Sequence, residues 1–150
     1  PRRITIIEEG IDIPVPLPFP SESRFSISST RISLINHLLH LEKDAVDEIL
    51  ILGRTAFFLS EAIIQITPHI SFIKPGAVIQ ATIFDLECVG SLHHEKIGHA
   101  LRISDLRCLL DDHGQKLSLQ IIDRYFDISI ERTTLHFTLT LVKKAHGKGK

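Results

Sequence analysis

The chain has 150 residues, of which 43% are hydrophobic and 23% charged, and its formal charge is −1. These values are typical of a single globular domain that folds without disulfides or a structural metal. The near-neutral charge excludes attraction to nucleic acid or to an anionic membrane through bulk charge. No apolar run approaches the length of a membrane span, and two cysteines do not make a disulfide framework. We therefore expect one cytoplasmic domain without a cofactor or metal, a nucleic-acid partner or a membrane span.

Residues 1–20 are predicted to form an extended, proline-rich arm. Ile4, Ile6 and Ile7 have the composition of a short strand, and prolines then recur at every second position from Pro14 to Pro20. Prolines at this spacing cannot donate to a strand ladder, so the arm either lies against the body or binds a protein partner. At the other end, the basic segment 143–150 is predicted to be a flexible, solvated tail.

Two helices are predicted in the first half of the chain. Apolar residues from Ile32 to Leu41 repeat with helical spacing after good N-cap residues at 28–30. Residues 45–66 fit either one long helix or a short strand over 49–52, broken at Gly53 and followed by a helix from Thr55 to Ile66. Because its last part is apolar almost all round, this helix should be the most buried one.

From Pro68 onward the pattern predicts strands. They are expected over 70–73, over 77–89 after a turn at 74–76, over 99–110, and over 116–123 as the second strand of a hairpin. The clearest strand signal in the chain is a repeat of period two, in which Leu135, Phe137, Leu139 and Leu141 alternate with His136, Thr138, Thr140 and Val142. The second half should therefore form an antiparallel sheet.

Few residues suggest chemistry directly. His93, His94 and His99 gather in one polar turn, but their spacing does not fit a zinc motif and favours a solvated loop. No phosphate-binding glycine loop or nucleophile elbow is present. Glu61, one helical turn before Gln65 on the apolar helix, is either a general acid or base or a structural hydrogen-bonding group.

A family resemblance starts from the same helix. The segment Leu59-Ser60-Glu61-Ala62-Ile63-Ile64-Gln65 resembles the L-x-E-A-x-x-Q stretch of hot-dog-fold 3-hydroxyacyl-acyl-carrier-protein dehydratases, and Pro75-Gly76 is similar to the turn that follows it there. The resemblance covers residues 45–142 and extends to related thioesterases. It implies an α+β, hot-dog-like fold in which an antiparallel sheet wraps a central buried helix. It also implies a homodimer that binds acyl-CoA or acyl-carrier protein.

The resemblance also implies a site. Glu61 matches the catalytic glutamate of the family, whereas the position of its histidine is taken by Asp47, which becomes a second candidate. Gln65, Phe57 and Phe58 are expected to contact the substrate. The implied function is acyl-thioester binding or processing in fatty acid metabolism, as a thioesterase or a dehydratase-like lyase without the catalytic histidine. The alternative is a non-enzymatic assembly subunit that binds a protein partner through the proline-rich arm and a sheet edge.

Overall fold

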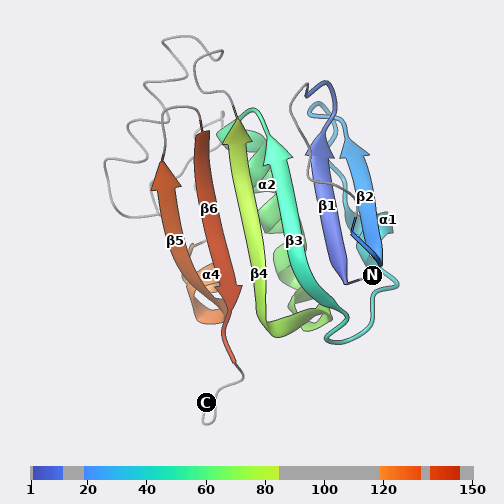
Figure 1. Ribbon diagram of the computed structural model, residues 1–150, viewed down its shortest axis with the longest axis vertical. Coiled ribbons are helices and arrows are strands. Elements are labelled where there is room, and N and C mark those ends of the chain that lie inside the picture. Colours follow the sequence, from blue (N-terminus) through green and yellow to red (C-terminus); the bar gives the residue numbers. More distant parts are fainter. Residues whose placement is uncertain (1, 12–18, 85–118, 133–135, 146–150) are drawn as a thin grey trace.

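A mixed six-stranded sheet with the order β2-β1-β3-β4-β6-β5 forms the centre of the molecule (Figure 1). The computed structural model describes residues 2–11, 19–84, 119–132 and 136–145. β1 pairs in parallel with β2 and β3, and β3 with β4, whereas β6 is antiparallel to β4 and β5. The elements are β1 (Arg3–Glu8), β2 (Glu22–Ile27), α1 (Ile35–Leu38), β3 (Val46–Gly53), α2 (Ala56–Ile66), η1 (Thr67–Phe72), β4 (Ile73–Phe84), α4 (Leu119–Tyr125), β5 (Phe126–Arg132) and β6 (His136–Lys143).

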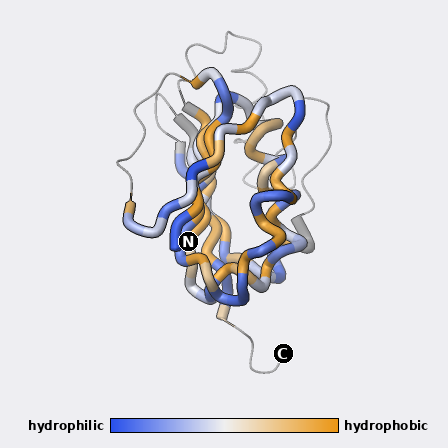
Figure 2. Tube along the Cα trace, turned by 90° about the vertical axis from the view of Figure 1, so that its right-hand side faces the viewer, coloured by the Kyte–Doolittle hydropathy of each residue, from blue (hydrophilic) through white to orange (hydrophobic). Residues whose placement is uncertain are grey.

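The described helices lie on one face of this sheet, so the molecule has a strand layer and a helix layer (Figures 1 and 2). Alternate strand residues point toward the helices and form the core with the inner face of α2. Fully or almost fully buried members are Ile4, Ile6, Ile49, Ile51, Ile79, Phe58, Leu59, Ala62, Ile63 and Ile66. Isoleucine-rich runs of this kind suit parallel strands, because the β-branched side chains pack well on a buried pleated surface.

The predicted hot-dog fold is wrong. A hot-dog sheet is antiparallel and wraps around its helix. Here α2 follows β3 and precedes β4 in the sequence, these two strands are parallel neighbours in the sheet, and the helix packs on one sheet face. Parallel neighbours need a crossover connection, and α2 with η1 supplies it. The heptapeptide at 59–65 describes a buried amphipathic helix in either fold, so the resemblance could not distinguish between them.

Two sequence predictions are confirmed. Of the two alternatives for residues 45–66, the strand followed by a helix is correct: β3 ends at Gly53 and α2 begins after Thr55. The Thr55 hydroxyl caps the helix by accepting the Phe58 N–H at 3.1 Å. The alternating segment at 135–142 corresponds to β6.

Other predicted elements differ. The first helix is reduced to α1, because the Ile32 carbonyl, which a longer helix would use internally, accepts the Gln65 side-chain N–H at 2.8 Å. Residues 67–72 form the 3-10 helix η1, which contains Pro68. α4 occupies residues 119–123 of the hairpin strand predicted over 116–123, whose first three residues lie outside the described ones, and β5 was not predicted.

The predicted turn at Lys74-Pro75-Gly76 lies inside β4. Val46 of β3 pairs with Ile73, but Glu48 already pairs with Val78, so the extra residues bulge from the strand. Gly76 has a φ of 88°, which its missing side chain permits. The predicted strand over 99–110 and the turn with His93, His94 and His99 lie outside the described residues.

Both ends of the chain contribute to the sheet. Residues 3–8, inside the predicted arm, form the interior strand β1, in which Ile4 and Ile6 are buried. Residues 12–18 of that arm lie outside the described residues. Lys143, the first residue of the predicted tail, ends β6 and donates to the carbonyls of Ile70 at 2.8 Å and Ile73 at 2.5 Å. Burial lowers the pKa of Lys143, although Asp44 acts in the opposite direction.

A buried acid links β1 to the edge strand β2. The Glu22 side chain, 4% exposed, accepts a hydrogen bond from the Thr5 hydroxyl and another from the Phe19 N–H at 3.0 Å. Arg24 Nε lies 3.0 Å from Glu22 Oε1. Arg3 Nε is 3.5 Å from Oε2, within ion-pair range but not aligned for a hydrogen bond. Burial raises the pKa of Glu22, but the hydrogen bonds from Thr5 and Phe19 and the hydrogen bond and charge of Arg24 outweigh burial, so its pKa lies below the ordinary 4.5.

We expect Glu22 to make the stability depend on acid. A carboxyl whose pKa is lower in the folded than in the unfolded state stabilises the fold above the unfolded value, and this contribution disappears as the pH falls through the folded value. The free energy of unfolding, measured in urea between pH 3 and 7, should therefore decrease below pH 4.5, and Glu22→Gln should flatten this decrease. Glu9→Gln, at an exposed position, should keep the wild-type profile. An unchanged profile in Glu22→Gln would contradict the role of the buried acid.

Candidate functional site

The topology of the parallel strands marks one edge of the sheet as a candidate site. The chain runs from β1 to β2 on one side and then to β3 on the other side of β1. The carboxyl ends of these strands lie at the upper edge in Figure 1. In open α/β sheets ligands bind outside the carboxyl ends of the strands, where the strand order reverses. The segments that follow Glu8 and Gly53 are therefore the candidate site.

Glu8 is a buried acid at this reversal point. It ends β1 and is only 3% exposed, and its Oε1 accepts the backbone N–H of Arg54 at 2.8 Å. A buried carboxylate requires such compensation. Arg54 lies directly before the Thr55 cap of α2, so the positive end of the helix dipole also favours the charge. The Glu8 carboxylate, a group of the protein itself, thus occupies the position beside the start of α2 that suits an anion.

Gly53 makes this arrangement possible. A β-carbon at this position would lie 2.7 Å from Phe58 Cδ2, 3.0 Å from Leu59 Cδ1 and 3.3 Å from Glu8 Oε1. The first of these distances is shorter than side chains tolerate, and all three neighbours are buried. A glycine therefore allows the end of β3, the first turn of α2 and the Glu8 carboxylate to meet.

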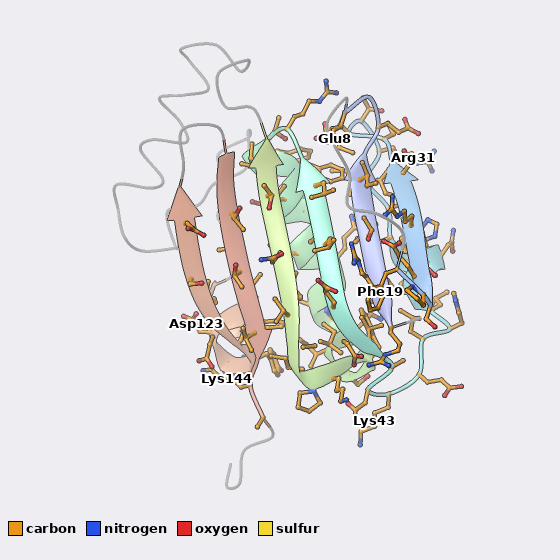
Figure 3. All side chains as sticks on the ribbon, in the orientation of Figure 1. Glu8, Phe19, Arg31, Lys43, Asp123 and Lys144 are labelled. Atoms are coloured by element: carbon orange, nitrogen blue, oxygen red, sulfur yellow. The ribbon has the colours of Figure 1, made fainter. Side chains whose placement is uncertain are left out.

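The Arg54 side chain forms the exposed part of the site. Its Nη2 donates to the Glu9 carbonyl at 3.3 Å and lies 3.2 Å from the position of a β-carbon on Gly10. Gly10 has a φ of 85°, a conformation that glycine adopts without strain. The guanidinium therefore rests on the backbone after β1. Figure 3 shows Glu8 at this edge and Asp123 and Lys144 at the opposite one.

The sequence candidates on α2 form a different, structural group. Glu61 and Gln65 are half-buried, and Gln65 Nε2 donates to Glu61 Oε2 at 3.1 Å. The same amide donates to the Ile32 carbonyl and accepts the Leu34 N–H, both at 2.8 Å. The structural hydrogen-bonding role that the sequence suggested for Glu61 therefore belongs to Gln65, which makes the hydrogen bonds to the backbone. These bonds attach the segment before α1 to α2.

The remaining sequence candidates have other surroundings. Asp47 accepts from Arg2 Nε at 2.7 Å and lies 3.9 Å from Lys74 Nζ, so its partners differ from those of Glu61. Phe58 is fully buried in the core, and Phe57 is half-buried. The structure does not test a catalytic or substrate role for any of the five candidates.

Sequence analysis missed Glu8 and Arg54. Each lies at or directly after the end of a strand and within two residues of a glycine, in the segments Glu8-Glu9-Gly10 and Gly53-Arg54-Thr55. That pattern becomes informative once the strands are known to be parallel neighbours. Within the described residues, no group of three or more His, Cys, Asp or Glu side chains could hold a metal, and no helix could span a membrane.

Comparison with known proteins gives a limited likeness. No protein-family model and no curated protein matches the chain. An O-methyltransferase family protein from Burkholderia thailandensis has a TM-score of 0.44 at 12% identity over 85% of this chain and 37% of its own. A protein from Pyrococcus horikoshii has a TM-score of 0.42 at 11% identity over 83% and 60%. A SAM-dependent methyltransferase from Methanosarcina mazei has a TM-score of 0.37 at 14% identity over 84% and 69%.

The chain thus spans less than two thirds of the first two structures. With scores and identities this low, the likeness gives no argument for a shared activity.

The acyl-thioester function is therefore corrected together with the fold. It rested on a wrapped helix and its sheet, and the parallel strands exclude that architecture. The alternative, partner binding through the proline-rich arm and a sheet edge, also finds no support in the fold or the comparisons. Acyl-CoA or acyl-carrier protein and a second copy of the chain, the partners expected with that assignment, are not tested by these observations.

We expect Gly53→Ala to destabilise the protein by about 2–3 kcal/mol, because the added methyl group overlaps the Phe58 ring. Gly76→Ala is the control: nothing lies within 4 Å of its β-carbon, so only the positive φ should cost about 1 kcal/mol. The measurement is the free energy of unfolding from urea denaturation. Equal losses in the two variants would show that α2 does not depend on close contact at Gly53.

We expect Gln65→Leu to lower the free energy of unfolding by about 2 kcal/mol. The substitution leaves the Leu34 N–H and the Ile32 carbonyl without their present partner. Glu61→Gln, which leaves those two bonds in place, should change the stability by less than about 1 kcal/mol. A larger loss in Glu61→Gln than in Gln65→Leu would make Glu61 the structural residue of the pair.

Proposed function

We propose that this chain is a small-molecule-binding domain whose ligand lies outside the carboxyl ends of β1 and β3. The observation that carries the proposal is the coincidence of two independent features at one place. The strand order reverses between β1 and β3, and there a buried carboxylate fixes the backbone from which Arg54 projects. Sites of this kind in open α/β sheets bind nucleotides and similar ligands.

The local chemistry divides into a rigid part and an accessible part. Glu8 and Gly53 are buried and hold the two strand ends together. Glu9, Gly10 and Arg54 are exposed at the same edge and offer a carbonyl, a glycine backbone and a guanidinium to a ligand. A binding site needs this combination, because contact groups select a ligand best when the scaffold below them does not move.

The test is a map of binding on the folded chain. Amide chemical shifts would be recorded while adenosine, AMP, S-adenosylmethionine and a fragment library are added in turn. Nucleosides are included because they are the ligand class typical of this position in the fold. We expect the perturbed amides to cluster at Glu9, Gly10 and Arg54, while those of Asp123 and Lys144 at the opposite edge stay unchanged. Perturbations that gather elsewhere, or that never include this edge, would refute the proposal.

A further inference from the structure

Arg54 differs from its neighbours on the sheet in its electrostatic partners. Arg2 pairs with Asp47, Arg3 with Glu22 and Glu48, and Arg24 with Glu22. In the part of the chain that the structure describes, no carboxylate lies within ion-pair distance of the Arg54 guanidinium. Its one hydrogen bond there is to the neutral carbonyl of Glu9, so most of its five donor hydrogens are available.

The two acids closest in sequence to this contact do not neutralise Arg54. Glu8 is buried, and its carboxylate accepts a hydrogen bond from the backbone N–H of Arg54 rather than from the guanidinium. Glu9 is exposed to water, which screens its charge. Its carbonyl, not its carboxylate, holds Nη2. An anion that approaches Arg54 therefore meets a cation held by the Glu9 carbonyl, opposed by the solvated carboxylate of Glu9 and by the buried carboxylate of Glu8, whose charge the Arg54 backbone N–H already partners.

The backbone around the guanidinium also favours a ligand. Gly10 has no side chain, and a β-carbon there would lie 3.2 Å from Nη2. The planar guanidinium can bind two oxygens of one phosphate or carboxylate at once, which lysine cannot do. It thus has the geometry, the exposure and the charge of an anion-recognising group.

From these observations we infer that the ligand of the proposed site carries an anionic oxygen group, phosphate or carboxylate, which binds the Arg54 guanidinium. The inference rests on the proposed function and adds the chemical class of the ligand. Arg54 selects the charged group, and Glu8 positions Arg54 through its backbone, independently of the side chain at position 54.

The experiment is a titration of the folded chain with inorganic phosphate, succinate, AMP and adenosine. Binding is monitored through the chemical shifts of the Arg54 Nε–H and of the Gly10 amide. We expect saturable shifts with phosphate or succinate, and tighter binding of AMP than of adenosine if the group is a phosphate. Arg54→Gln should weaken anion binding by about tenfold or more, with Arg54→Lys intermediate. Arg124→Gln, at an exposed position of α4, should leave it unchanged, and Glu9→Gln should strengthen it.

The outcomes separate the two proposals. Adenosine or neutral fragments that bind at this edge equally well in wild type and Arg54→Gln, with no preference for anions, would overturn the anion inference and leave the proposed function intact. Probes that bind only at other surfaces would overturn both. The Glu8 hydrogen bond uses the backbone N–H, so Arg54→Gln should keep the wild-type amide spectrum away from the site.

Discussion

The close contact between the end of β3 and the first turn of α2 is the constraint on which the rest of the structure depends. α2 contributes Phe58, Leu59, Ala62, Ile63 and Ile66 to the core beneath the parallel strands, and its first turn can approach the end of β3 because Gly53 has no side chain. The same approach brings the Glu8 carboxylate beside the start of the helix. One glycine therefore governs core packing, the crossover from β3 to β4, and the geometry of the candidate site.

Local structure could be predicted from the sequence better than the sheet topology could, because the signals that identify a helix or strand come from residues close together in the sequence. Gly53 interrupts an apolar run and Thr55 is a good cap, so the strand and helix on either side could be recognised. In β6, Leu139 and Leu141 are buried whereas Thr138, Thr140 and Val142 are half-buried, because the described helices lie on one face of the sheet. Both signals depend on residues near in sequence, and neither carries information about which strand lies beside which.

Strand direction and several elements depend on contacts between distant residues. The strand at 46–53 pairs in parallel with the strand at 3–8. The path of the chain that connects the two strands decides this direction, and the composition of either strand does not. The first predicted helix shortens to α1 because Gln65, about thirty residues later, binds its backbone. The resemblance to hot-dog enzymes rested on one buried helix and a Pro-Gly pair. A helix of that kind is compatible with many sheets, so the motif was too local to determine the fold.

The same argument explains why the candidate site was not visible in the sequence. Glu8 and Arg54 lie 46 residues apart, and neither belongs to a recognisable motif. Folding joins them because parallel strands end at a common edge, where the start of α2 needs a negative partner. Glu8 supplies that partner internally, which leaves the helix start with less attraction for an external anion. The positive charge still open to a ligand is then the Arg54 side chain, and this places recognition on the exposed turn after β1 rather than on the helix.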